Sequence, residues 1–282
     1  MVLITSKLSV AQNQFAASGG MAFDVSNLQW SIAGNIEGQS PNILSELNFN
    51  TITSLGYFLE CRYSPINRLE IVTYYQANKV LSGEGTDFDY SDDNRTNPIY
   101  GLSFVSDKGN LNVVKIGVRT PLFKSNVVSF FTALNYLYNG QDFNILSPEE
   151  KELRSTYKTK MHGIHLALET DTQLSNTVSV LFSFACAYSS YRAEADWNLR
   201  DIFKHPISFL QTSNGINMDG SLQVNYQINS VISVAMGARY GRTKVFRGTD
   251  TSFLASNVNV STQFNGALYT RYGSMLGTKI TF

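Results

Sequence analysis

An acidic segment at residues 83–98 carries the side chains of this chain best suited to chemistry. It reads GEGTDFDYSDDNRTNP and contains four aspartates, Asp87, Asp89, Asp92 and Asp93. Side chains two apart on a strand share a face, so Asp87 and Asp89 would project together from an extended strand end. Such a carboxylate pair tends to share a proton, and it can position and deprotonate a water molecule. The alternative is a solvated acidic loop, able at most to bind Ca²⁺.

The sequence contains no other pattern typical of a catalytic or ligand-binding site. His162 and His165 are three residues apart, so on a strand they face opposite sides and cannot share a metal ion. No Gly-x-Ser-x-Gly elbow occurs, and neither cysteine has a plausible histidine partner. The glycine-rich patches lack the spacing of phosphate-binding loops. We therefore expect neither a metal ion nor a cofactor.

The composition suits a wall between lipid and water. Hydrophobic residues make up 43 % of the 282 residues, and only 16 % are charged, against the usual quarter or so. Aromatic residues reach 12 %, with 15 Tyr and 18 Phe. The 22 basic and 22 acidic residues balance, which argues against nucleic acid as a partner. No stretch of 18 uncharged apolar residues is available for a transmembrane helix.

Strand patterns run from residue 20 to the last residue, and they are separated by alternately short and long connections. The short turns are residues 64–68, 120–126, 170–176 and 229–230. The long polar segments are residues 34–42, 82–98, 144–155, 193–215 and 248–259. Tight turns at one end and long loops at the other are typical of transmembrane barrels. The sequence therefore predicts a closed antiparallel transmembrane β-barrel of about ten strands.

Alternation of apolar and polar residues is clearest near the C-terminus. In residues 221–228, Leu222, Val224, Tyr226 and Ile228 share one face, and polar side chains share the other. A soluble β-sandwich also alternates, but its strands are usually about 5–6 residues long. The polar face here is rich in Ser, Asn, Gln and Gly rather than Lys and Glu, and the chain ends on a strand at Phe282. These features favour the barrel.

The alternation assigns side chains to the two faces of the wall. The predicted lipid-facing belt contains Leu222, Val224, Tyr226, Ile232, Val234, Met236, Leu268, Leu276 and Ile280. Aromatic residues expected toward its borders are Tyr57, Tyr136, Tyr240 and Tyr272. We expect His162 at the outer interface and His165 in the lumen. Arg239, Arg271 and Lys279 would be costly in lipid, so they should face the lumen and pair there with Glu46 and Glu60.

Two further features concern the cysteines and the N-terminus. Cys61 and Cys186 both fall within predicted strands, and we expect two isolated thiols rather than a disulfide. Residues 1–12 resemble the end of a secretory signal interrupted by Lys7. We expect residues 1–19 to be a leader or signal-peptide remnant and residues 20–282 to form a single barrel domain.

Four segments resemble the omptin family of outer-membrane proteases. Residues 39–47 (QSPNILSEL) look like the opening of the second omptin strand, and the turn Ser64-Pro65-Ile66 leads to a third strand ending in Asp87-Phe88-Asp89. Residues 193–198 (AEADWN) are similar to the segment where omptins carry an Asp-x-His pair. The similarity is spread over roughly residues 28–282. It implies a ten-stranded barrel in a bacterial outer membrane, in contact with the bilayer and lipopolysaccharide.

The resemblance also implies where a catalytic site would lie. In omptins two acidic residues face an Asp–His dyad across the barrel mouth, and a water between them attacks the peptide bond. Asp87 and Asp89 match the acidic pair, and Asp196 matches the dyad carboxylate. The dyad histidine position is occupied by Asn198, and an amide cannot accept the proton at neutral pH. His205 could replace that histidine only if its loop folds back toward Asp196.

Three functions remain open. A non-catalytic barrel could bind a partner protein, peptide, surface polymer or lipopolysaccharide through its loops. An active omptin-type endopeptidase would take its general base from an unconventional position. A small-solute channel is the third, although narrow barrels usually fill their lumen with side chains. We expect the non-catalytic binding barrel.

Overall fold

The computed structural model describes residues 14–66 and 68–282, and almost all of them lie in strands. The strands are β1 (Gln14–Ile32), β2 (Ser45–Ile66), β3 (Leu69–Asp92), β4 (Thr96–Val105), β5 (Gly109–Lys124), β6 (Val128–Leu146), β7 (Arg154–Gln173), β8 (Val178–Asp196), β9 (Phe209–Gln227), β10 (Ile232–Val245), β11 (Gly248–Phe253) and β12 (Asn259–Thr281). A single 3₁₀ turn, η1 (Asp93–Arg95), joins β3 to β4. Within the described ranges, no helix is long and apolar enough to span a bilayer.

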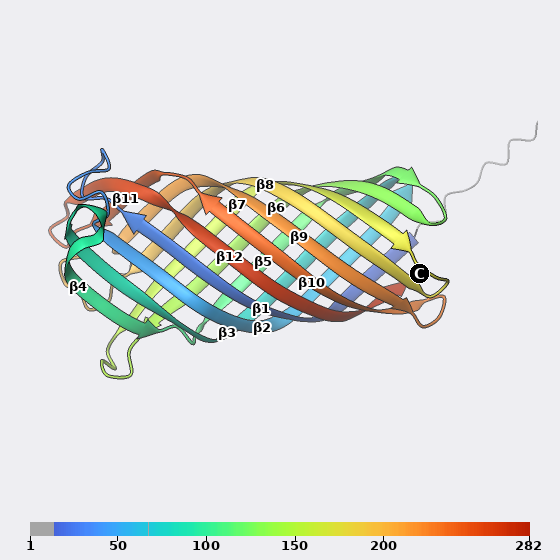
Figure 1. Ribbon diagram of the computed structural model, residues 1–282, viewed down its shortest axis with the longest axis horizontal. Coiled ribbons are helices and arrows are strands. Elements are labelled where there is room, and N and C mark those ends of the chain that lie inside the picture. Colours follow the sequence, from blue (N-terminus) through green and yellow to red (C-terminus); the bar gives the residue numbers. More distant parts are fainter. Residues whose placement is uncertain (1–13, 67) are drawn as a thin grey trace, which may run out of the picture.

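The strands form one closed antiparallel ring (Figure 1). Each strand pairs with its neighbour in order, and β1 pairs with β12 from Ala16–Thr281 to Ile32–Phe264, which closes the ring. β4 and β5 lie one after the other along β3, and the short β11 follows β10 between β9 and β12. Ten strands therefore complete the ring, as the sequence predicted, and β4 and β11 extend it at one end.

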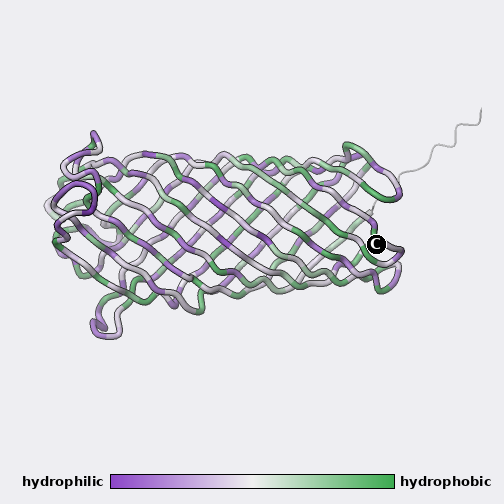
Figure 2. The backbone as a smooth tube through the Cα atoms, in the orientation of Figure 1, coloured by the Kyte–Doolittle hydropathy of each residue, from purple (hydrophilic) through white to green (hydrophobic). Residues whose placement is uncertain are grey.

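The two ends of the barrel differ. Short turns join the strands at the end that holds the C-terminus, here called the turn end (Figure 1). Longer, mostly hydrophilic connections, together with β4 and β11, lie at the opposite loop end (Figure 2). A tilted strand crosses a bilayer in about 9–11 residues. Since β3 has 24 residues, the wall continues well beyond the membrane.

The first strand begins earlier than the sequence suggested. β1 starts at Gln14, so residues 14–19, which the sequence assigned to a leader, belong to the barrel wall. They continue the antiparallel pairing with both β2 and β12. The expected signal-peptide remnant at residues 1–12 lies outside the described residues.

The outer face carries the predicted apolar belt. Large side chains on β9, β10 and β12 are exposed there, among them Leu222, Tyr226, Met236 and Leu276 at 51–65 %. His162 is also exposed and contacts the Tyr136 hydroxyl group. His165 is buried in the lumen, with its Nδ1 atom 3.2 Å from Asn135 Nδ2. The two histidines therefore face opposite sides of the wall, as predicted.

An irregularity in β2 and β3 reverses which residues face inward. The pairing register shifts between Asn50 and Ser54 of β2, opposite residues 80–84 of β3. Toward the turn end, even-numbered residues such as Gln76 and Asn78 are buried in the lumen. Toward the loop end, odd-numbered residues take over the inward positions, because an extra residue on one strand shifts its alternation by one.

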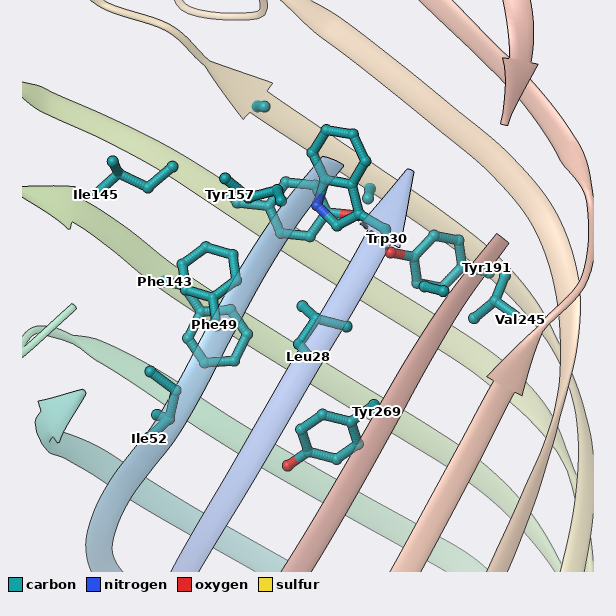
Figure 3. Close-up of a cluster of buried hydrophobic side chains, with 14 of the residues drawn as sticks. Leu28, Trp30, Phe49, Ile52, Phe143, Ile145, Tyr157, Tyr191, Val245 and Tyr269 are labelled. Atoms are coloured by element: carbon teal, nitrogen blue, oxygen red, sulfur yellow. Dashed lines mark hydrogen bonds between the residues drawn. The ribbon is translucent and has the colours of Figure 1, made fainter. Parts of the chain in front are cut away.

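A large aromatic and aliphatic core fills the lumen toward the loop end. Its buried members come from every strand of the ring: Leu28, Trp30, Leu47, Phe49, Ile52, Val80, Phe104, Leu111, Phe143, Ile145, Tyr157, Met161, Tyr191, Ala193, Ala195, Phe209, Val245, Phe264, Ala267 and Tyr269. Phe49 packs on Phe143 (Figure 3), with ring centroids 4.9 Å apart, and its ring centroid lies 5.3 Å from that of Phe104. Trp30 stacks on Tyr157 at 5.4 Å. Offset aromatic packing of this kind adds to the stability that burial itself provides.

The lumen toward the turn end is polar and contains ion pairs. Arg239 donates to Asp24 at 2.8 Å, and Arg271 donates to Asp219 at 3.2 Å. Both arginines point inward as predicted, but the predicted partners were wrong. Glu60 pairs with Arg62, and Glu46 pairs with Arg95 outside the lumen. Lys279 and Glu60 help to line a cavity of about 200 Å³ in this half. Cys61 and Cys186 are both free.

Candidate functional site

Asp87 and Asp89 point together into the barrel mouth, in line with their spacing. Asp87 pairs in register with Leu47 on β2 and Leu102 on β4, and Leu47 is fully buried in the core. Residues directly opposite on paired strands share a face, so Asp87 and Asp89 lie on the inner face. Their side chains differ in burial: Asp87 is only 5 % exposed, whereas Asp89 is half-buried.

Both carboxyl groups lie beyond the membrane, because the exposed apolar side chains of β3 end at Leu81. Burial, together with the neighbouring Asp89 charge, raises the pKa of Asp87 to about 7. The Arg200 charge and the Trp197 side chain oppose that rise in the pKa. Burial also raises the pKa of Asp89, against the opposing effects of Ser45 and Arg200. Asp87 is therefore a carboxyl group that exchanges its proton near neutral pH.

The loop between β8 and β9, residues 197–208, covers this carboxylate pair. Trp197 packs against the core, with its ring 4.8 Å from Phe209. The Arg200 guanidinium group lies over the Tyr100 ring, 4.6 Å from its centroid. Tyr100 on β4 is the register partner of Asp89. The loop thus reaches from β8 to the β3–β4 side of the mouth.

Asp196 and His205 form a second pair. The Nδ1 atom of His205 is 2.6 Å from Asp196 Oδ1, so loop 197–208 does fold back to bring the imidazole to this carboxylate. Their side chains are 37 % and 25 % exposed. Asp196 therefore has a histidine partner, and this histidine comes from residue 205 rather than from residue 198.

The second pair lies on the other face of the wall. Asp196 pairs in register with Thr156, while the neighbouring pair Ala195–Tyr157 is fully buried in the core. Since adjacent side chains on a strand alternate, Asp196 projects outward. The inward position that follows Ala195 is taken by Trp197. The four predicted site residues therefore form two pairs, Asp87–Asp89 inside and Asp196–His205 outside.

Asn198, at the position of the omptin histidine, has a structural role. Its Oδ1 atom accepts hydrogen bonds from the Arg154 backbone N–H at 2.8 Å and from the Ser155 hydroxyl at 3.1 Å. Its Nδ2 atom donates to the Glu152 carbonyl at 2.8 Å. Asn198 thus ties loop 197–208 to the β6–β7 loop. In the described part of the chain, no group of three His, Cys, Asp or Glu side chains could hold a metal ion.

Sequence reasoning missed three residues of the mouth, Tyr100, Trp197 and Arg200. Trp197 lies inside the segment that resembles the omptin Asp-x-His pair, and strand alternation from the buried Ala193 and Ala195 could have placed it inward. Nothing in the sequence connects Arg200 with Tyr100, because Arg200 is in an irregular loop and Tyr100 lies a hundred residues earlier.

A second buried carboxyl group was also missed. Asp250 on β11 is 2 % exposed and lies in register with Gln211 and Thr262 on the adjacent strands. Burial raises its pKa to about 7, and the Gln211 side chain opposes that rise. Gln211 also accepts a hydrogen bond from the Tyr157 hydroxyl group at 2.7 Å. These groups belong to the polar edge of the aromatic core.

Comparison with known proteins places the chain among outer-membrane proteins. Residues 20–282 match the family model Pom, described as Protochlamydia outer membrane protein. No curated protein matches the sequence. The crystal structure of the outer membrane protease OmpT from Escherichia coli superimposes with a TM-score of 0.72 at 12 % identity, covering 95 % of this chain and 97 % of OmpT. At this identity the similarity concerns the fold alone, and it confirms the omptin-like barrel.

Two other barrels match more loosely. OprG from Pseudomonas aeruginosa gives a TM-score of 0.41 at 10 % identity, covering 96 % of this chain and 97 % of its own. Ail from Yersinia pestis gives 0.32 at 8 % identity, covering 96 % and 99 %. OprG is described as an outer membrane protein, and Ail is described as the attachment invasion locus protein.

Proposed function

The chain belongs to the Protochlamydia outer membrane protein family, and from that premise we propose that it is a non-hydrolytic binding barrel. It lies in a bacterial outer membrane and has an omptin-like fold. Its loop end faces outward and binds a partner protein or peptide. The proposal is carried by the contact of His205 with Asp196, which by strand alternation lies on the outward side of β8, whereas Asp87 lies on the inner face of β3.

The separation of the two pairs removes the chemistry of the omptin-like site. A water molecule attacks a peptide bond only if a base within hydrogen-bond reach takes its proton. His205 is bound to Asp196, whose side chain projects outward by strand alternation, whereas Asp87 lies on the inner face, so we infer that His205 does not reach a water held by Asp87. Asp87 has a suitable pKa of its own, but at 5 % exposure beneath loop 197–208 it offers no access to a peptide bond.

The lumen argues against a solute channel. The aromatic core is one contiguous cluster to which every strand of the ring contributes. Interiors of this kind are packed about as densely as organic crystals, so they leave no continuous path for a solute. The cavity of about 200 Å³ lies on the turn-end side of this core.

The loop end has features expected of a binding surface. Ile99, Ile202 and Val258 are 53–67 % exposed there. The loops that carry the last two are joined, because the Ala255 N–H donates to the Ile202 carbonyl, and the Leu254 N–H donates to the Val258 carbonyl within the β11–β12 loop. Exposed apolar side chains on a fixed scaffold commonly mark interaction sites.

The outer face would contact lipopolysaccharide as well as the bilayer. Lys158 and Lys160 are exposed on β7, on the loop-end side of His162 and its neighbour Tyr138. Aromatic side chains with cationic side chains next to them on the loop-end side suit the border between lipid chains and phosphate groups. We include lipopolysaccharide among the partners on this basis.

The test is hydrolysis of a fluorogenic peptide panel, including paired basic residues, by the full chain with lipopolysaccharide present. We expect wild-type turnover to equal that of an Asp87→Asn/His205→Ala double variant. The general-base step is typically worth ~10²–10⁴-fold, so a working site would separate the two proteins clearly. Wild-type turnover that either single substitution abolishes would refute the proposal.

A further inference from the structure

The cavity of about 200 Å³ in the lumen extends from the aromatic core to the turn end. Near the turn end its lining includes Asp171, Asn225 and Lys279, each two residues before the end of its strand. Near the core its lining includes Arg271, the next inward residue after Tyr269 of the core. Since the core fills the lumen toward the loop end, a small molecule would enter this cavity from the turn end.

The inner end of the cavity holds one more positive charge than its carboxylates balance. Lys115, Asp219 and Arg271 line both the cavity and an adjoining recess of about 20 Å³, so they lie close together. Arg271 pairs with Asp219 at 3.2 Å, and Arg239 pairs with Asp24 at 2.8 Å. Among the described residues, Lys115 has no carboxylate within 4 Å. An ammonium group without a counter-ion is unfavourable inside a protein, so this end of the cavity favours an anion.

Hydrogen-bond donors at this end also lack acceptors. His165 is 3 % exposed, and within the described ranges its Nε2 atom has no hydrogen-bond partner. Because Asn135 Nδ2 donates to His165 Nδ1 at 3.2 Å, the imidazole proton is on Nε2. Arg271 Nε is likewise buried without a partner. The Lys115 ammonium group lies 5.6 Å from the Tyr74 ring centroid, a cation–π contact that leaves its N–H groups free to bind an acceptor.

Small side chains on three adjacent strands leave room beside these donors. Ala133 on β6, Ala167 on β7 and Ala185 on β8 form one buried cluster and line the cavity. His165 is the next inward residue to Ala167 on β7. The space therefore has an apolar wall on β6–β8 and cations on β5 and β12. Such a space suits a small molecule that has a compact apolar part and an anionic group.

The acidic residues nearer the turn end are matched by cations, so they do not outweigh the charge at the inner end. The ion pairs there are Glu60–Arg62 at 2.6 Å and Glu169–Arg119 at 2.7 Å. Asp171 and Lys279 add one charge of each sign to the lining. Residues 1–13 and 67, outside the described ranges, contain no Asp or Glu that could add to these groups.

We propose that this cavity binds a small molecule by an oxyanion, a phosphate or carboxylate group, through Lys115, His165 and Arg271. The oxyanion accepts hydrogen bonds from the Lys115 ammonium group, His165 Nε2–H and Arg271 Nε–H. Bonds between a cationic donor and an anionic acceptor are roughly twice as strong as those between neutral groups. The site lies on the other side of the aromatic core from the proposed partner-binding surface and does not depend on it.

The experiment is equilibrium dialysis of radiolabelled inorganic phosphate against the full chain in non-ionic detergent at fixed ionic strength. We expect saturable binding. Lys115→Met removes the unpaired ammonium group and should weaken binding at least about tenfold, the size of one charge-assisted hydrogen bond. Competition by unlabelled acetate distinguishes the two sources of the oxyanion: displacement by acetate assigns the site to carboxylates, and persistence of bound phosphate assigns it to phosphates.

Thermal unfolding gives a second measurement on the same proteins. Phosphate that binds the folded chain raises the unfolding temperature of wild type. Lys115→Met lacks the uncompensated charge, so without phosphate it should unfold at a higher temperature than wild type, and phosphate should not raise that temperature further. Lys115→Gln serves if the methionine variant does not migrate as a folded barrel on an unheated gel.

Two control variants separate this cavity from general charge effects. Lys151→Met removes an exposed cation from the β6–β7 loop and should leave phosphate binding unchanged. Ala167→Leu keeps all three donors but fills the space beside them, and it should abolish binding. Phosphate binding that does not saturate, that is equal in wild type and Lys115→Met, or that falls equally in Lys151→Met would overturn the inference.

Discussion

His205 Nδ1 lies 2.6 Å from Asp196 Oδ1 on the outward side of the barrel rim. This contact joins the last residue of β8 to the far end of loop 197–208, and it closes the loop on itself. Both side chains are partly exposed. The pair thus fixes the loop whose other residues, Trp197 and Arg200, cover the mouth.

The first prediction concerns pH and Asp250. Burial raises its pKa from 3.8 to about 7, so the folded protein holds this proton more tightly than the unfolded chain. The resulting stability is fully present below about pH 4 and is lost as the pH rises through 7. Asp250→Asn cannot ionise. At pH 8 it should be more stable than wild type by at most on the order of 4 kcal/mol and should therefore unfold at a higher temperature. At pH 4 the two proteins should unfold at similar temperatures.

Thermal unfolding in detergent, followed by circular dichroism at both pH values, measures this difference. Asp201→Asn is the control, since Asp201 is exposed in loop 197–208. An equal gain at pH 4 and pH 8 would show that packing rather than ionisation is responsible.

A second prediction concerns Asn198. Asn198→Ala removes three hydrogen bonds, one to Glu152 in the β6–β7 loop and two to Arg154 and Ser155 at the start of β7. Water compensates in part at this half-buried position, so we expect a loss of about 1–2 kcal/mol. Trypsin should cleave after Lys151 several times faster in the variant. Asn229→Ala, which removes a similar cap at the turn end, should leave that rate unchanged.

The lumen ion pair gives a third prediction. Asp24 is 1 % exposed and accepts hydrogen bonds from Arg239, Gln76 and Asn78. Asp24→Asn leaves the Arg239 cation without its counter-ion, which typically costs about 3–5 kcal/mol when the pair is buried. Asp24→Asn combined with Arg239→Met removes both charges and should recover part of that loss. Urea unfolding of the two variants compares them. If the double variant were less stable than Asp24→Asn alone, the unpaired Arg239 charge could not be the cause of the loss of stability.

The fold was predictable because a transmembrane barrel repeats one pattern. Leu222, Val224 and Tyr226 alternate with polar residues along β9, and the structure exposes the first set on the outer wall. Short and long connections then fix the number of strands. The inward direction of Arg239 followed from the cost of a charge in lipid, but its partner did not. Asp24 is 215 residues away in sequence, and periodicity does not identify contacts at that distance.

The site was less predictable, since it depends on irregular backbone. The sequence gives no sign that the register shifts between Asn50 and Ser54, which turns Glu46 outward. Asp87 and Asp89 still share a face, because they are two residues apart and both follow the shift on β3. The approach of His205 to Asp196 depends on the path of loop 197–208, whose backbone follows no repeating pattern.

Cross-linking across the rim tests most directly whether the two pairs form one site. In a chain whose Cys61 and Cys186 are replaced by serine, cysteines are introduced in pairs and treated with a short bifunctional thiol reagent. Asp196→Cys with His205→Cys, and Asp87→Cys with Trp197→Cys, should cross-link efficiently. Asp87→Cys with His205→Cys should not, because the wall separates them. Efficient cross-linking of that last pair would contradict the account and restore the single omptin-like site.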